Sequence, residues 1–198
     1  MSRRHSDVHE PPESRENADR EVLARMATGD ASALSELYDR HARTVYSFAY
    51  RIVAQDAGDV TQEVFSQAWR HAQRYDRSRA PVGAWLMMIT RARAIDSLRA
   101  RRAHTSAEQR AVDVSIADLQ YASPSQESAV ISAEEAARVR HALAGLSQVQ
   151  RAVIELAFYG GFTHAEIAEQ LREPLGTIKT KVRLGLMKLR TALVNRAG

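Results

Sequence analysis

Apolar residues recur at every third or fourth position along most of this chain, whereas no stretch alternates apolar and polar residues at every second position. The first pattern is typical of amphipathic helices, and the second, which is missing, is typical of half-buried strands. In residues 34–52 the apolar residues fall on one side of a helix, and Val60, Val64 and Ala68 repeat the pattern in the next segment. The sequence therefore predicts an all-α fold without a sheet.

The composition limits the kinds of site and compartment that fit this chain. It has 198 residues, of which 44% are apolar, enough for one domain or two small ones. Because cysteine is absent, disulfides and thiolate metal sites are excluded. No apolar run approaches the roughly 18 residues of a membrane span, and the N-terminus lacks the apolar core of a signal peptide. We expect a cytoplasmic protein that does not insert into a membrane.

The charge of the chain is concentrated in blocks of opposite sign. Residues 85–104 carry five arginines against one aspartate, and residues 172–196 carry seven lysines and arginines against one glutamate. Between them, residues 105–135 carry six carboxylates against one arginine. Basic blocks of this kind are typical of contacts with a polyanion. The pattern predicts two polyanion contacts, separated by a segment that avoids them.

The distribution of helical patterns predicts two small helical domains. Residues 1–18 are polar and contain two adjacent prolines, so we expect a disordered tail. Helical patterns run through residues 20–103 and resume over 132–196. The segment 104–131 is acidic, rich in Ser, Ala and Gln, and has no periodicity, so we expect a flexible linker with a reach of roughly 30 Å.

The segment 164–190 has the pattern of a helix-turn-helix. Thr163 with Glu166 predicts a capping box at the start of its first helix, as does Ser147 with Gln150 for the helix before it. REPLG supplies the turn. One side of the second helix is predicted to be apolar, with Ile178, Val182, Leu186, Leu189 and Leu193. This pattern points to a recognition helix whose first turns face base edges in the major groove.

A second basic helix is predicted from about residue 81 to residue 102. Its apolar stripe is predicted to consist of Trp85, Met88, Ala92 and Ile95, with Thr90, Arg93, Ser97 and Arg101 on the opposite face. From these residues alone, the arginine-rich end fits a solvated helix surface as well as a nucleic-acid contact.

Three carboxylates lie close together in the sequence, on Asp56, Asp59 and Glu63. One explanation is an acid–base or metal centre of a nucleic-acid hydrolase. No His or Cys completes the cluster, and no Gly-rich phosphate loop lies nearby. Carboxylates at the start of a helix also interact favourably with the helix dipole, which is the simpler explanation.

Three motifs in this order and spacing resemble one known family. They are DAGDVTQEVFSQAWRHAQRYD, GAWLMMITRARAIDSLRARR and LSQVQRAVIELAFYGGFTHAEIAEQLREPLGTIKTKVRLGLMKLR. Together they resemble the extracytoplasmic-function (ECF) sigma factors, the promoter-recognition subunits of bacterial RNA polymerase, over about residues 20–193. The resemblance implies a protein without enzymatic activity or cofactor that binds core polymerase and directs promoter recognition, DNA melting and transcription initiation.

The resemblance also assigns partners to the two domains. The first would bind the β′ clamp helices and the −10 promoter element, and the second would bind the −35 element. The polymerase β flap is a further expected partner, and family members are often held by an anti-sigma factor. The family's polymerase contact corresponds here to Asp59, Thr61, Gln62, Glu63 and Phe65. Its residues for reading the −35 element correspond to Lys179, Thr180, Arg183 and Leu184.

The chain departs from the family near the −10 element. The family often has an asparagine seven residues after the tryptophan of the second motif, where this chain has Ala92. Arg91 and Arg93 flank that position, and we expect them to contact the −10 DNA. The helix-turn-helix taken alone also fits a free-standing regulator that binds an operator as a dimer, and the first domain and the linker favour the sigma factor.

Overall fold

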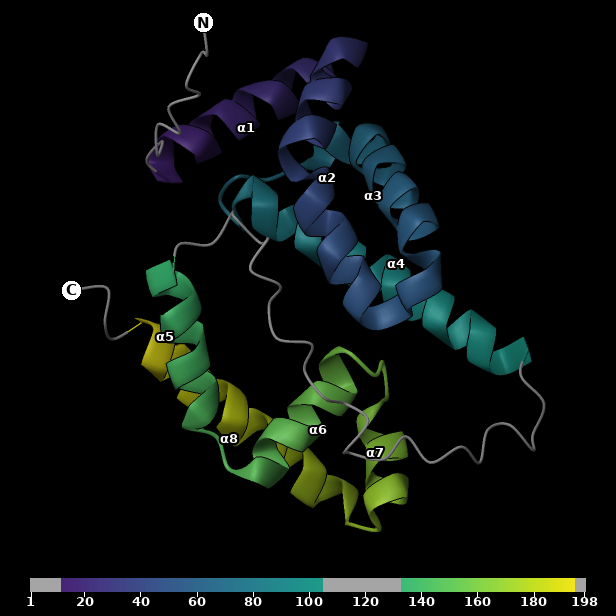
Figure 1. Ribbon diagram of the computed structural model, residues 1–198, viewed down its shortest axis with the longest axis vertical. Coiled ribbons are helices and arrows are strands. Elements are labelled where there is room, and N and C mark those ends of the chain that lie inside the picture. The colour runs from purple at the N-terminus through teal and green to yellow at the C-terminus, as the bar shows by residue number, and fades with distance from the viewer. Residues whose placement is uncertain (1–11, 105–132, 195–198) are drawn as a thin grey trace, which may run out of the picture. The chain divides into compact units, whose positions relative to one another are not determined.

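The computed structural model describes residues 12–104 and 133–194 (Figure 1). Within these ranges the chain is helical and contains no strand, which confirms the all-α fold class. The α-helices are α1 (Pro12–Ala27), α2 (Ala31–Val53), α3 (Ala57–His71), α4 (Val82–His104), α5 (Ala133–Ala144), α6 (Gln148–Phe158), α7 (His164–Leu171) and α8 (Leu175–Val194), and the 3-10 turns are η1 (Ala54–Asp56) and η2 (Ala72–Arg74). None of the helices in these ranges combines the length and apolar character that a membrane span requires.

The chain divides into two compact units, Met1–Ala94 and Ile95–Gly198. The division falls inside α4, and most of the predicted linker lies in segment 105–132, outside the described residues. The domain boundaries expected from the sequence, 20–103 and 132–196, therefore stay a prediction.

Helix α1 begins at Pro12, so the disordered tail predicted for residues 1–18 is wrong from Pro12 onward. The residues before it lie outside the described part of the chain. Proline suits the first turn of a helix, because its fixed φ is helical and an N–H would have no partner there. The second half of α1 buries Val22, Leu23 and Met26, which are at most 3% exposed. The first half is polar, so hydrophobic periodicity did not reveal it.

An ionic cluster fixes α1 against α2. Asp19 of α1 is 5% exposed, and its carboxylate lies 2.7 Å from Nε of Arg40 and 2.8 Å from Nε2 of His41. Arg40 also donates from Nη2 to the backbone carbonyl of Arg15 at 3.1 Å. A carboxylate is stable in a protein interior only when it is paired or hydrogen-bonded. The partners of Asp19 therefore explain how the polar half of α1 is attached to the first unit.

Helix α3 buries one side completely. The buried residues of this side are Ala57, Val60, Thr61, Val64, Phe65 and Ala68. The ring of Phe65 lies 4.8 Å from that of Tyr38 on α2, measured between centroids. The hydroxyl of Thr61 donates to the backbone carbonyl of Ala57 at 2.7 Å, so this polar side chain is buried with a partner. The predicted burial of Val60, Val64 and Ala68 is confirmed.

The buried stripe of helix α4 agrees with the predicted one at Ile95 but differs at Met88 and Ala92. Its buried residues are Val82, Leu86, Ile89, Thr90, Ala94 and Ile95. Met88 and Ala92, predicted in the core, are exposed, and Met88 is 56% exposed. Thr90, predicted on the far face, is fully buried, and its hydroxyl donates to the carbonyl of Leu86 at 2.8 Å. This local hydrogen bond makes threonine compatible with a core position, which hydropathy alone does not indicate.

The second unit is organised around a small apolar core shared by α6, α7 and α8. The core consists of Val153, Leu156, Ile167 and Ile178, all fully buried. Phe162, Leu171 and Val182 pack against it and are partly buried. The predicted capping box of Ser147 and Gln150 starts α6. One residue from each of α7 and α8 thus fixes both helices on α6.

Replacing Phe65 with alanine should lower the free energy of unfolding of the full chain by about 3–5 kcal/mol, the usual cost of removing a buried phenylalanine side chain. Gln62→Ala, on the exposed side of the same helix, should change it by no more than about 0.5 kcal/mol. Urea denaturation followed by circular dichroism measures both values. Similar small effects of the two substitutions would contradict the burial of Phe65.

Candidate promoter-DNA and polymerase interfaces

Helices α7 and α8 are joined by a tight turn with well-defined ends. The backbone N–H of Thr163 donates to Oε2 of Glu166 at 2.6 Å, and the N–H of Glu166 donates to Oγ1 of Thr163 at 3.2 Å. This is the predicted capping box, and the first bond is the main cause that lowers the pKa of the Glu166 carboxyl. Arg172 ends α7 with a left-handed φ of 53°, and the carbonyl of Pro174 accepts the N–H of Thr177 at the start of α8. The predicted helix-turn-helix is confirmed.

The side of α8 that faces its own unit begins with Ile178. Val182 and Leu189 follow on the same side and are half-buried. Gly185 completes it, and a Cβ added there would lie only 2.6 Å from Cδ1 of Ile154 on α6. Because glycine has no side chain, α6 and α8 approach each other closely at this point.

The opposite side of α8 carries the residues predicted to read DNA. Lys179, Thr180, Arg183 and Leu184 are all exposed. The hydroxyl of Thr180 donates to the carbonyl of Gly176 at 2.9 Å, and Nη1 of Arg183 lies 3.7 Å from Sδ of Met187. Neither Lys179 nor Arg183 forms an ion pair with a residue in the described ranges. Both cations therefore remain available to a polyanion.

Two other lysines of α8 are engaged inside the unit. Nζ of Lys181 lies 2.6 Å from Oε1 of Glu173 in the turn, and both side chains are about half-buried. Nζ of Lys188 lies 3.3 Å from Oε1 of Gln150 on α6. In the first turns of α8, the positive charge that faces outward is thus concentrated on Lys179 and Arg183. A count of charges along the sequence does not distinguish Lys179 and Arg183 from Lys181 and Lys188, which have partners inside the unit.

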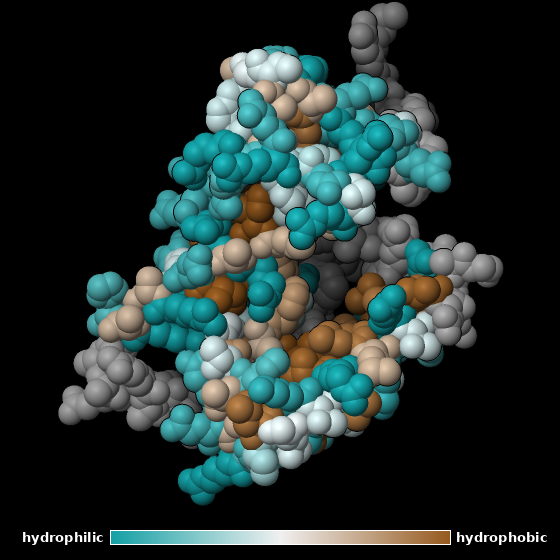
Figure 2. Space-filling view, turned by 180° about the vertical axis from the view of Figure 1, so that it is seen from behind, coloured by the Kyte–Doolittle hydropathy of each residue, from teal (hydrophilic) through white to brown (hydrophobic). Residues whose placement is uncertain are grey.

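Apolar side chains also reach the surface of the second unit, where hydrophobic residues are visible in the lower half of Figure 2. Leu186, Met187, Leu193 and Val194 of α8 are 51%, 53%, 42% and 62% exposed. Leu186 and Leu193, predicted on the apolar side of the helix with Ile178, are exposed, and Gly185 lies against Ile154 of α6. Exposed apolar patches are typical of surfaces that bind other proteins.

The predicted polymerase contact on α3 is divided between two faces of the helix. Asp59, Gln62 and Glu63 are exposed, whereas Thr61 and Phe65 are each 4% exposed. The side chains of Thr61 and Phe65 support α3 from inside the unit, so the exposed part of the predicted contact is Asp59, Gln62 and Glu63. A helical motif that is continuous in sequence includes residues from both faces, because successive residues are about 100° apart.

The residues predicted near the −10 element differ in their surroundings. Nη1 of Arg93 lies 3.2 Å from Oε1 of Glu63, so an ion pair joins α4 to the exposed face of α3. Arg91 is half-exposed, and Ala92 is exposed beside Met88, which lies four residues earlier on the same side of α4. Sequence reasoning missed the pair of Arg93 and Glu63, because no motif links residues 30 positions apart.

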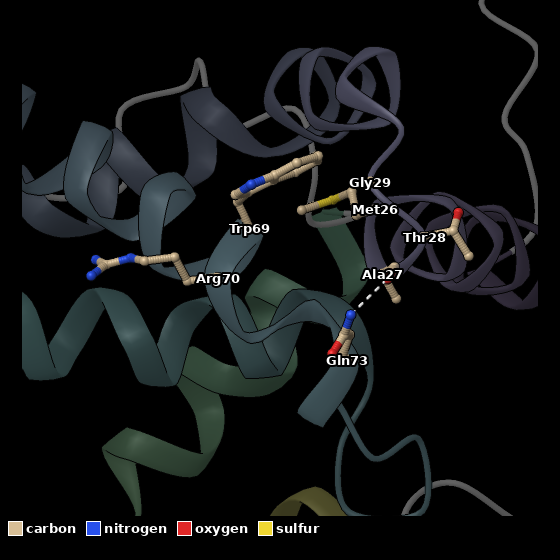
Figure 3. A pocket seen from close by; sticks show the side chains of 7 residues that line it. All are labelled: Met26, Ala27, Thr28, Gly29, Trp69, Arg70 and Gln73. Atoms are coloured by element: carbon tan, nitrogen blue, oxygen red, sulfur yellow. Dashed lines mark hydrogen bonds between the residues drawn. The ribbon is translucent and has the colours of Figure 1, made fainter.

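A shallow pocket of about 390 Å³ lies where the end of α1 meets the end of α3 (Figure 3). It is lined by Met26, Ala27, Thr28, Gly29, Trp69, Arg70 and Gln73. Nε2 of Gln73 donates to the backbone carbonyl of Ala27 at 3.0 Å and joins the two sides. Arg70 is exposed and lies on the same face of α3 as Asp59, so the pocket is at the end of the exposed face. No sequence motif predicted it, since two separate helices supply its lining.

Both parts of the chain match regions of known sigma factors. A family model described as "Sigma-70 region 2" matches residues 37–104, and one described as "Sigma-70, region 4" matches residues 136–189. The "ECF RNA polymerase sigma factor SigK" of Mycobacterium ulcerans is 36% identical over 175 residues, which cover 87% of this chain and 91% of the relative. The protein of the same name from Mycobacterium tuberculosis is 35% identical, with the same coverage. A solved structure of Rhodobacter sphaeroides SigE in complex with the anti-sigma ChrR matches 89% of this chain and 98% of that one, with 31% identity and a TM-score of 0.43.

The matched regions contain the three motifs that were distinguished in the sequence. A free-standing helix-turn-helix regulator would account for the match to region 4 alone, so the match to region 2 favours the sigma factor. The SigK relatives, moreover, align with most of the chain. The chain belongs to the ECF family of RNA polymerase sigma factors, which bind core polymerase and direct it to promoters.

Proposed function

We propose that this sigma factor reads the −35 promoter element with the outward face of α8. The supporting observation is that Lys179, Thr180, Arg183 and Leu184 are all exposed on the side opposite Ile178. Arg183 has the chemistry for a bidentate contact to guanine, and Lys179 for guanine acceptors or a phosphate. Thr180 suits a base or backbone contact, and Leu184 suits the methyl group of thymine.

The polymerase contact that we propose is the exposed face of α3, limited to Asp59, Gln62 and Glu63. These three side chains lie opposite the buried residues of the same helix, so packing of the buried side keeps this face of α3 turned outward. The β′ clamp helices are the polymerase element that the family resemblance assigns to this face. Glu63 also forms an ion pair with Arg93, which links the proposed polymerase contact on α3 directly to α4.

The −10 contact that we propose lies on α4 around Ala92. Arg91 is the cation that supplies affinity for the melted strand, because single-stranded DNA is a polyanion. Arg93 holds Glu63 and acts through the position of α4 relative to α3. The small side chain of Ala92 leaves room on the exposed face beside Met88.

The remaining expectations follow from family membership. We propose that the protein acts without catalytic chemistry of its own, in the cytoplasm where RNA polymerase transcribes. The polymerase β flap and an anti-sigma factor are the further protein partners that we expect. The exposed Leu186, Met187, Leu193 and Val194 supply an apolar surface that suits such partners.

Arg183→Ala should weaken binding to the preferred −35 sequence by about 1–3 kcal/mol and relax the selection at one base position. The measurement is selection from a promoter library with a randomised −35 element by polymerase holoenzyme that contains the full chain. Lys188→Ala is the matched control, because Lys188 lies farther along the helix and contacts Gln150. It should leave base preference unchanged. A changed preference with Lys188→Ala and none with Arg183→Ala would mean that α8 does not dock in this orientation.

The double substitution Asp59→Ala and Gln62→Ala should weaken binding to core polymerase without unfolding the protein, because both side chains are exposed. Pull-down of core enzyme measures the binding, and circular dichroism tests the fold. Glu169→Ala, on the exposed surface of α7, removes a carboxylate from the other unit and serves as the control. If the folded double variant binds core enzyme as well as the control does, the α3 face is not the contact.

Arg91→Ala should reduce open-complex formation more than initial promoter binding, because the strand that it contacts becomes single only after melting. Permanganate footprinting reports unpaired thymines and a mobility-shift assay reports total binding. An equal loss of both signals would show that Arg91 only attracts duplex phosphate.

A further inference from the structure

Two tyrosines of α2 form an exposed aromatic pair that no role described so far requires. Tyr46 and Tyr50 are 45% and 56% exposed. Their ring centroids lie 6.1 Å apart and their planes are inclined by 27°. The third exposed tyrosine of α2, Tyr38, differs because its ring packs against Phe65. Among the three exposed tyrosines of α2, Tyr46 and Tyr50 thus differ from Tyr38 in that their rings contact each other within α2 itself.

The surroundings of the pair are basic. Arg43 lies three residues before Tyr46, and Arg51 directly follows Tyr50, and both arginines are exposed. Neither forms an ion pair with a residue in the described ranges. Arg20, Arg25 and Arg40 of the same unit, in contrast, all pair with carboxylates. No Asp or Glu occurs between residues 40 and 55 of the sequence, so the aromatic pair lies in a purely cationic stretch.

The geometry of the rings determines how they could hold a ligand. A base inserted between two rings needs two stacking distances, and a separation of 6.1 Å is within the range of rings that already interact with each other. The pair is thus an extended π surface with an outer face, and not a slot. Base–aromatic stacking next to arginines that neutralise phosphate is the usual means of binding single-stranded nucleic acid without sequence preference.

We propose that Tyr46, Tyr50 and Arg43 form a stacking platform for single-stranded DNA on α2. Nucleic acid is the occupant that the charge favours, because Arg43 and Arg51 flank the rings and no carboxylate occurs between residues 40 and 55. The inference deepens the proposed function, since the melted promoter supplies a single strand. The platform gives this strand a second contact in addition to the −10 contact on α4.

The test measures binding of the full chain to a fluorescent oligodeoxythymidine of about 12 nucleotides, a length within the site sizes of single-strand binders. Fluorescence anisotropy at low salt gives the affinity. Tyr46→Ala and Tyr50→Ala should each weaken binding about fivefold or more, the loss expected when a stacked base loses its ring. Tyr46→Phe and Tyr50→Phe are the matched controls, and they should bind like the wild type because the ring face is retained. Arg43→Ala should flatten the salt dependence.

Several results would overturn the platform. They are a wild-type chain that does not bind the oligonucleotide, alanine variants that bind it equally well, and phenylalanine variants that are as weak as the alanine variants. Pull-down of core polymerase is performed with the same proteins. Loss of polymerase with unchanged DNA binding would identify the face as a protein contact, which also overturns the proposal. If the wild-type chain itself did not bind polymerase, the proposed function would be contradicted instead. The DNA-binding measurement would then still test the platform.

Discussion

Burial of Ile178 is the constraint on which the DNA-binding half of this protein depends. The side chain is fully buried against Val153, Leu156 and Ile167, so it sets the rotation of α8 about its own axis. With Ile178 inside, Lys179 and Arg183 must face outward, because neighbouring positions on a helix are about 100° apart. Gly185 reinforces the same rotation two turns later, where only a residue without a side chain fits beside Ile154. The orientation of the proposed recognition face is therefore a consequence of packing on its opposite side.

The same relation between a buried and an exposed face holds in the first unit. Helix α3 buries Thr61 and Phe65 and thereby presents Asp59, Gln62 and Glu63. The ion pair of Glu63 with Arg93 also connects the proposed polymerase contact on α3 with the proposed −10 contact on α4. A partner that binds Glu63 competes with Arg93 for the carboxylate. The proposed contacts for polymerase and for DNA are in this way linked by one ion pair between α3 and α4.

Much of this architecture could be predicted from the sequence, because helical periodicity and end signals are local. The capping boxes at Ser147 and Thr163 and the position of the recognition helix follow from residues a few positions apart. The burial of Thr90 and the contact at Gly185 could not be predicted, since one depends on a local hydrogen bond and the other on a missing side chain. The first half of α1 was missed because its attachment through Asp19 is ionic. The Arg93–Glu63 pair and the pocket beside Trp69 depend on tertiary packing, for which no local pattern exists.

The central claim is that this chain gives core polymerase its promoter specificity through two separate sets of exposed residues. Run-off transcription of fragmented genomic DNA tests it most directly, with purified core polymerase in the presence and absence of the protein. We expect a discrete set of transcripts that appears only when the protein is added and that starts downstream of one shared −35 and −10 sequence. Transcripts that are the same with and without the protein, together with binding of the protein alone to duplex DNA as a dimer, would contradict it.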